Sequence, residues 1–135
     1  MLDVRDFATR YTAAWCSQNA ASVAAFFAPN GSLTINYGTP SVGPEAIAAA
    51  ARSFMTAFPD LQVIMDRVID RSDKAEYHWT LIGTHSGPGG TGNPVRVSGF
   101  ESWQFGPDGL IASSQGHFDS ADYNRQLEPG SHEPV

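Results

Sequence analysis

The chain has 135 residues, of which 41% are hydrophobic and 11% aromatic, a size and composition that suit one domain with its own apolar core. Its formal net charge of -6, with no run among the eight Lys and Arg residues, argues against binding to nucleic acid or to anionic membranes, which attract clustered positive charge. The single cysteine, Cys16, excludes an internal disulfide, and the N-terminal residues form no secretory signal, so we expect a cytoplasmic protein.

Three helices are predicted in the first half of the chain. Apolar residues recur at helical spacing over residues 4–15, and Asp3 is placed to cap the N-terminus of this helix. A shorter helix follows and ends at Pro29. The third helix spans residues 44–58, because a proline is favourable at its start and Pro59 cannot continue it.

The rest of the chain is predicted to be mostly β-structure. Apolar and polar residues alternate in five segments, and short turns rich in Gly, Pro and Asp separate several of them. The predicted strands cover residues 32–37, 61–70, 75–85, 95–105 and 110–118, and a short helix is predicted over residues 120–127.

This order of elements indicates an α+β fold. Helices come first, and consecutive strands that pair as a meander follow them. We therefore expect three N-terminal helices packed on a strongly curved antiparallel sheet, a cone whose open end forms a small-molecule pocket. We predict one domain over residues 1–128 and a flexible tail over residues 129–135.

Three segments carry a family resemblance. They are Phe58-Pro59-Asp60-Leu61, Gly83-Thr84-His85-Ser86-Gly87 and Asp119-x3-Tyr123-x2-Gln126-Leu127. Together and in this order they resemble the SnoaL-like polyketide cyclase family, within the nuclear transport factor 2-like superfamily. The resemblance implies a cone-shaped α+β barrel, a homodimer or higher oligomer, and ring closure by intramolecular aldol condensation without cofactor or metal.

The resemblance also implies a catalytic residue. The family's acid–base aspartate, at the end of the last strand, corresponds to Asp119. His117 and Gln115 lie two and four positions earlier and share its face of the strand. We predict that Asp119, assisted by His117, abstracts a proton next to a substrate carbonyl. The alternative is that Asp119 only caps the following helix.

Six further residues are predicted to contact a substrate. They are polar or aromatic and reach the pocket in a cone of this kind, where Tyr or Asn could donate to a developing enolate oxygen. These residues are Tyr11, Trp15, Asn36, Tyr37, His78 and Arg96, and Gln115 on the strand face of Asp119 is predicted to contact the substrate with them.

Which face of the sheet lines the pocket stays open. Regular hairpin registers place His78 and Arg96 on the polar face of His117 and Asp119. The opposite face is more apolar, as a pocket wall should be, but it could equally form an oligomer interface, or a β-bulge could exchange the faces. Glu101 lies on this apolar face, either as a second acid or as an interface residue.

Motifs for other chemistries do not occur. The four His residues show no metal-ligand spacing, residues 87–92 lack the Lys of a phosphate loop, and no nucleophile elbow is present. The leading hypothesis is a cofactor-independent enzyme that cyclises a small, largely apolar, carbonyl-bearing substrate. Epoxide opening or ketosteroid-isomerase-like double-bond isomerisation in the same pocket, and a non-catalytic binding or assembly module, remain as alternatives, because fold does not decide reaction.

Overall fold

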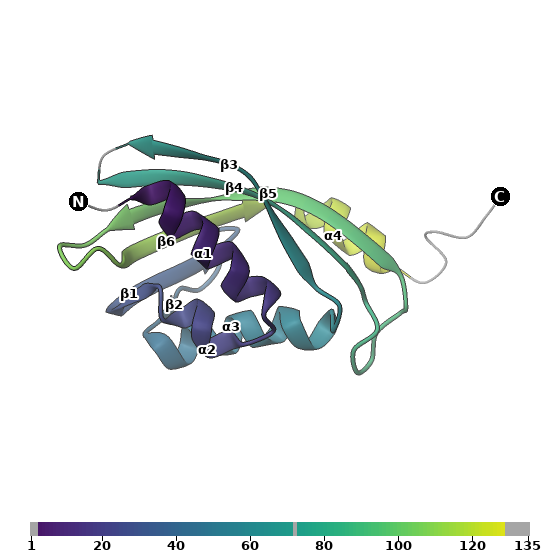
Figure 1. Cartoon of the computed structure of the whole chain (residues 1–135). Helices are drawn as coiled ribbons and strands as arrows, with labels where there is room; N and C mark the ends of the chain where they lie inside the picture. The colour runs from purple at the N-terminus through teal and green to yellow at the C-terminus, as the bar shows by residue number, and fades with distance from the viewer. Residues whose placement is uncertain (1–2, 72, 129–135) are drawn as a thin grey trace.

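A strongly curved six-stranded sheet wraps over a layer of helices (Figure 1). The structure is a computed structural model that describes residues 3–71 and 73–128, so the predicted tail over residues 129–135 lies outside the described residues. The helices are α1 (Val4–Cys16), α2 (Ala20–Ala24), α3 (Pro44–Ala57) and α4 (Ser120–Leu127). The strands are β1 (Phe27–Ile35), β2 (Ser41–Val42), β3 (Gln62–Arg71), β4 (Lys74–Thr84), β5 (Pro94–Phe105) and β6 (Ile111–Phe118). The predicted α+β class is confirmed.

The first and third helices begin at the residues predicted to start them. The Asp3 carboxylate accepts a hydrogen bond from the Asp6 amide at 3.0 Å at the start of α1. Pro44 stands in the first turn of α3, where its missing amide proton costs nothing. The second helix is shorter than predicted, because α2 ends at Ala24 and the chain is already extended by Phe27.

The sequence predicted a sheet that is antiparallel throughout, and this prediction was wrong for one pair of strands. Its strand order is β2-β1-β6-β5-β4-β3, and the meander from β3 to β6 is antiparallel, but β1 runs parallel to β6. No hairpin joins β1 to β6, so turn geometry does not impose an antiparallel pairing on them. A register shift between Phe27 and Ser32 lets β1 begin before the Pro-Asn-Gly segment that was predicted to precede it.

The apolar face of the meander is the concave one and carries the core. β4 and β5 pair without a register shift, with Tyr77 opposite Glu101 and Trp79 opposite Gly99. Tyr77 stacks on Trp103 with ring centroids 4.8 Å apart, and α1 covers this layer (Figure 1). The predicted sharing of faces is therefore confirmed, and no bulge exchanges the faces of β4 and β5.

Candidate functional site

A mainly apolar cavity lies between the helices and the concave face of the sheet. Side chains from α1, α3 and five strands form its wall, and Tyr123 of α4 closes one side. Its volume is about 60 Å³, several times the space that one water needs. The described lining residues are Trp15, Leu33, Ile35, Phe54, Val63, Tyr77, Trp79, Leu81, Val97, Glu101, Gly116, Phe118 and Tyr123.

Glu101 is the one lining residue with a carboxyl group among the described residues, and it is 7% exposed. Its Oε1 atom accepts hydrogen bonds from Ser114 Oγ at 2.7 Å, Trp103 Nε1 at 3.0 Å and the Tyr11 hydroxyl at 3.1 Å. Its Oε2 atom lies 3.2 Å from the same Tyr11 hydroxyl. Three donors from α1, β5 and β6 thus fix one carboxyl group at the inner wall of the cavity.

Burial dominates the electrostatics of this group. It raises the pKa of Glu101, against the hydrogen bonds from Trp103, Ser114 and Tyr11, which lower it. Burial also raises the pKa of the Tyr11 and Tyr77 hydroxyls, so both phenols stay protonated over the physiological range. No Lys, Arg or His of residues 3–71 and 73–128 forms an ion pair with Glu101.

Small residues leave the space in front of this carboxyl group. Glu101 pairs with Gly116 across β5 and β6, so no side chain of β6 opposes it on the concave face. A Cβ atom at Gly116 would meet Thr34 O at 3.6 Å and Glu101 Cγ at 3.7 Å, which are ordinary contacts. The cavity therefore extends to the strand backbone beside Glu101.

Only one of the residues predicted to bind substrate lines the cavity, namely Trp15. Tyr11 is fully buried behind Glu101 and reaches the cavity wall only through that carboxyl group. His78 stacks on Phe100 on the convex face, at 5.5 Å between ring centroids. The structure thus brings Trp15 into the cavity wall and Tyr11 behind it, in contact with Glu101.

Asp119 and His117 do not line the cavity. Asp119 is exposed, and its carboxylate accepts a hydrogen bond from the Asp122 amide at 3.0 Å, which caps α4. His117 lies on the convex face between Phe100 and Tyr37, with ring centroids 5.0 and 4.9 Å away. Their predicted catalytic roles stay predictions.

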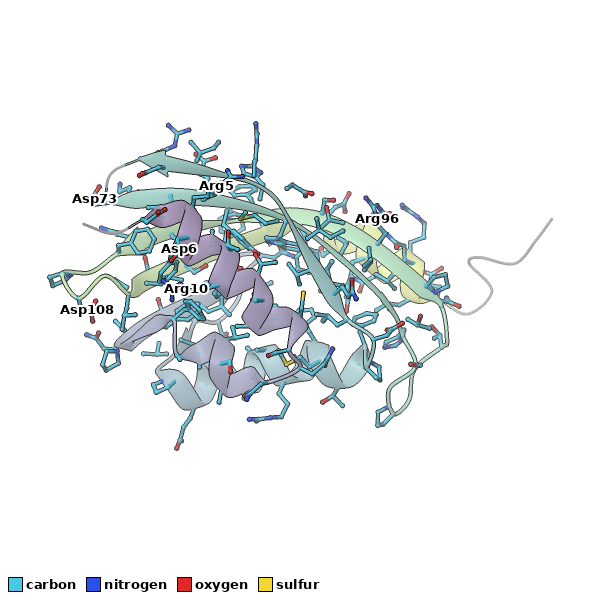
Figure 2. All side chains as sticks on the ribbon, viewed as in Figure 1. Arg5, Asp6, Arg10, Asp73, Arg96 and Asp108 are labelled. Atoms are coloured by element: carbon cyan, nitrogen blue, oxygen red, sulfur yellow. The ribbon has the colours of Figure 1, made fainter. Side chains whose placement is uncertain are left out.

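The other predicted contacts have structural partners outside the cavity. The Asn36 side chain accepts a hydrogen bond from the Phe118 amide at 2.9 Å, while Tyr37 is 86% exposed. Gln115 is exposed on the convex face. Arg96 is exposed near α4 (Figure 2), where the Gln126 amide group bonds its backbone N–H and carbonyl.

Charged side chains gather away from the cavity. Figure 2 shows Asp6, Arg10, Asp73 and Asp108 around one end of the molecule, at the start of α1 and the nearby hairpin turns. Arg10 is paired with Asp6 at 2.9 Å. The cavity wall itself is apolar apart from Glu101 and a few hydroxyl and indole groups.

The sequence left Glu101 open as a second acid or an interface residue, and the structure places it in the cavity wall. It is an acidic residue in phase with Val97 and Trp103 on the apolar face of its strand, where charged residues are rarely buried without partners. Its three donors come from positions 11, 103 and 114, and only the folded sheet brings them together.

The three segments that carry the family resemblance meet beside the cavity. Asp60 Oδ1 accepts a hydrogen bond from the Thr84 amide at 2.7 Å, and this bond lowers the Asp60 pKa. Phe58 packs against His85 at 5.4 Å and against Tyr123 of α4 at 6.4 Å between ring centroids. These motifs therefore join α3, β4 and α4 at the cavity edge, which is a structural role.

The described residues offer neither a metal site nor a membrane-spanning helix. Within residues 3–71 and 73–128, no three His, Cys, Asp or Glu side chains are grouped so that they could hold a metal ion. None of the helices in these ranges has the length and apolarity needed to cross a bilayer.

Comparison with known proteins points to one family. The model of the SnoaL-like polyketide cyclase family matches residues 5–127. A search among curated proteins returned no match.

Similar solved structures share the fold. TsrD from Streptomyces laurentii has a TM-score of 0.81 at 24% identity, with 97% of this chain and 99% of that chain covered. A protein with a ketosteroid isomerase-like fold from Catenulispora acidiphila DSM 44928, in complex with trimethylamine, has a TM-score of 0.81 at 17% identity. The match covers 96% of this chain and 97% of that chain. An NTF2-like protein of unknown function from Burkholderia pseudomallei K96243 has a TM-score of 0.80 at 19% identity. The match covers 94% of this chain and 98% of that chain.

Proposed function

The chain belongs to the SnoaL-like polyketide cyclase family, and from this premise we propose that it binds a small, largely apolar, carbonyl-bearing molecule in the concave cavity and catalyses acid–base chemistry of the cyclase or isomerase type on it. The observation that carries this proposal is the cavity itself. Its wall is apolar and includes one buried carboxyl group, Glu101. An apolar pocket with few polar groups orients a ligand and strengthens each polar contact inside it.

The favoured reaction is an intramolecular aldol cyclisation. A base removes a proton from the carbon next to one carbonyl, the resulting enolate carbon bonds to a second carbonyl carbon, and the new alkoxide takes up a proton. The atoms and charges balance within substrate and protein, so no oxidant or reductant is needed. Family resemblance assigns the acid–base role to Asp119, and spacing along the strand adds His117. Both lie outside the cavity wall, so turnover by their variants has to test this assignment, which remains a proposal.

A non-catalytic binding module is the second candidate. The observation in its favour is that Asp119 is exposed and caps α4, which is a sufficient structural reason for an aspartate at this position. A protein of this kind would bind the same small molecules without converting them. Turnover, rather than binding, separates the two candidates.

Hydrolytic opening of an epoxide and double-bond isomerisation are distinguishable from cyclisation by their products. Arg96, predicted on the same sheet face as Asp119, is the feature that favours epoxide hydrolysis, because an Arg beside an Asp could hold the attacking water. Hydrolysis incorporates oxygen from isotopically labelled water into the product, whereas cyclisation and isomerisation do not. Mass spectrometry of the product therefore tests hydrolysis directly.

We further propose a homodimer or higher oligomer that forms through the convex face of the sheet, in the cytoplasm. The support is a row of rings on that face, His78, Phe100, His117 and Tyr37, with neighbouring centroids 4.9 to 5.5 Å apart. Sedimentation velocity of the wild type and of Tyr37→Ser measures the oligomeric state. A wild-type protein that stays monomeric at high concentration contradicts this part of the proposal.

The experiment for the main proposal blocks the cavity. Ile35 lines it, so Ile35→Trp should fill it, whereas Ile64 on β3 is 42% exposed and Ile64→Trp should leave it open. We expect the wild type and Ile64→Trp to cyclise short linear triketide and tetraketide esters, and Ile35→Trp to lose this activity while it remains folded. Equal turnover by both variants would show that the chemistry does not use this cavity.

A further inference from the structure

The two oxygens of the Glu101 carboxyl group have different surroundings. Oε1 accepts from three donors, the Ser114 hydroxyl, the Trp103 indole and the Tyr11 hydroxyl, at 2.7 to 3.1 Å. Oε2 has one contact, with the Tyr11 hydroxyl that it shares with Oε1, at 3.2 Å. The unused hydrogen-bonding capacity of this group therefore lies on Oε2.

The donors also decide where a proton on this group resides. An indole N–H can only donate, so Oε1 must remain an acceptor towards Trp103. Ser114 and Tyr11 supply further hydroxyl protons to the same oxygen. A protonated Glu101 consequently carries its proton on Oε2.

The groups that face Glu101 give no compensation for a negative charge. From α1 it faces Tyr11, and from β4 it faces Tyr77, and the charge of an ionised Glu101 would act on both phenols. β5 and β6 contribute the neutral donors Trp103 and Ser114. A buried carboxylate without a cation is costly, and here burial outweighs the hydrogen bonds that favour ionisation.

We propose that Glu101 keeps its proton at neutral pH and donates a hydrogen bond from Oε2 to the carbonyl oxygen of a ligand in the concave cavity. The ligand contact rests on the proposed small-molecule function, whereas the protonation state does not. A carboxylic acid kept neutral by apolar surroundings is a strong donor towards an oxygen on which negative charge develops. The donor selects neutral carbonyl compounds, and it gives no advantage to amines or other cations.

Tyr11 is a positioning residue in this arrangement. It is fully buried, does not line the cavity, and contacts both carboxyl oxygens of Glu101. Its hydroxyl group, together with Trp103 and Ser114, holds Oε1 in place. Because the carboxyl group is rigid, this also fixes the direction in which Oε2 points. Tyr11 acts on the ligand only through Glu101.

The protonation state can be measured without any ligand. The chain has five glutamates, so a sample labelled with 13C at the glutamate side-chain carboxyl carbon gives a simple NMR spectrum. We expect one signal to keep the shift of a carboxylic acid at pH 7, and Glu101→Gln to remove that signal. If all signals have the shift of carboxylates at pH 7, the proposal is overturned.

The ligand contact is tested with a matched pair of probes. 1-Tetralone and tetralin have the same fused-ring frame, but only the ketone can accept a hydrogen bond. Their binding can be followed by the fluorescence of Trp15 and Trp79, which line the cavity. We expect the wild type to bind the ketone about tenfold more tightly than the hydrocarbon.

Two variants separate a donor from a base. Glu101→Gln keeps an acceptor for Trp103 and supplies an N–H donor, so its preference for the ketone should stay within about threefold of wild type. Glu101→Leu should lose the preference while it still binds tetralin.

A wild type without ketone preference, or a Glu101→Gln variant that has lost it, contradicts the donor role. Failure of both probes to bind contradicts the small-molecule pocket itself, and with it the ligand contact, whatever the NMR result. If Glu101→Leu does not fold, the wild type and Glu101→Gln still decide.

Discussion

The Tyr11 hydroxyl of α1 lies 3.1 Å from Oε1 and 3.2 Å from Oε2 of Glu101 on β5, and 90 positions of the chain separate the two residues. This contact joins the first helix to the centre of the curved sheet. Both side chains are buried, so the hydrogen bond is shielded from water. The same pair connects the packing of the fold to the polar group of the cavity.

Removal of this hydrogen bond should destabilise the protein. For Tyr11→Phe we expect the free energy of unfolding to fall by about 1 to 3 kcal/mol, because a buried carboxyl group loses one of its donors. The pKa of Glu101 should rise further, since the Tyr11 hydrogen bond lowers it. Urea unfolding measures the first effect, and NMR titration of Glu101 the second.

Tyr123→Phe is the matched control for this substitution. Tyr123 also packs at the cavity, but its pKa is raised by burial alone, and its hydroxyl has no hydrogen-bond partner among the described residues. Its removal should change stability by less than about 0.5 kcal/mol. A loss as large as that of Tyr11→Phe would show that general packing, rather than the contact with Glu101, accounts for the effect.

Glu101 should make stability depend on pH with an unusual sign for a carboxyl group. Its folded pKa is raised above the usual value of 4.5, so the folded protein holds this proton more tightly than the unfolded chain. Its contribution is fully present below pH 4.5 and is lost as the pH rises through the raised folded pKa. The wild type should therefore lose stability relative to Glu101→Gln as the pH rises above 4.5.

The control for this prediction is Glu76→Gln. Glu76 is a half-buried carboxylate whose pKa is lowered, chiefly by a hydrogen bond from Arg71. The contribution of its pairing with Arg71 is lost only as the pH falls below the usual value of 4.5, so this part of the difference between wild type and the variant should be flat as the pH rises above 4.5. Thermal unfolding across this pH range measures both differences. A flat difference for Glu101→Gln would mean that its proton is not retained in the folded state.

Two glycines on neighbouring strands should respond differently to Ala. A Cβ atom at Gly99 would lie 2.2 Å from the backbone oxygen of His117 and 2.8 Å from Trp79, so the strands must separate. At Gly116 the nearest contacts are 3.6 and 3.7 Å, so a methyl group fits but enters the cavity. We expect Gly99→Ala to cost about 3 kcal/mol of stability and Gly116→Ala about 1 kcal/mol or less.

Ligand binding provides a second test of the Gly116→Ala variant. Gly116→Ala should bind 1-tetralone more weakly than the wild type, because its methyl group takes space beside Glu101. Calorimetry of unfolding and a fluorescence titration test the two effects separately. Unchanged binding by Gly116→Ala would place the ligand elsewhere.

Local patterns in the sequence predicted most of the fold. Helical spacing and prolines predicted α1 and α3, and strict alternation predicted the registers that place Tyr77, Trp79 and Glu101 on one face. The parallel pairing of β1 with β6 was not predictable in this way, because the two strands are far apart in the chain and share no turn. Long-range pairing requires the complete fold.

The site was less predictable than the fold, for a physical reason. The resemblance directed attention to Asp119 and His117, at the end of a strand where the backbone turns into α4. Whether such side chains enter the cavity depends on how α4 and β1 pack, and the Asn36 hydrogen bond to the Phe118 amide shows one contact that sequence spacing cannot reveal. Glu101 is identified as a site residue only when its three donors are seen together.

The role of Asp119 can be resolved by separating its cap from its charge. Asp119→Ala removes the cap on the Asp122 amide, and we expect it to cost about 1 kcal/mol of stability. Asp119→Asn keeps a capping oxygen, so its stability should match that of the wild type, but it can no longer act as an acid or base. Unfolding in urea tests the cap, and turnover of the triketide and tetraketide esters tests the chemistry.

A stable Asp119→Asn variant that binds 1-tetralone but has lost turnover would support the catalytic role predicted from the family. Full turnover by that variant would restrict Asp119 to helix capping and leave Glu101 as the carboxyl group that acts in the cavity.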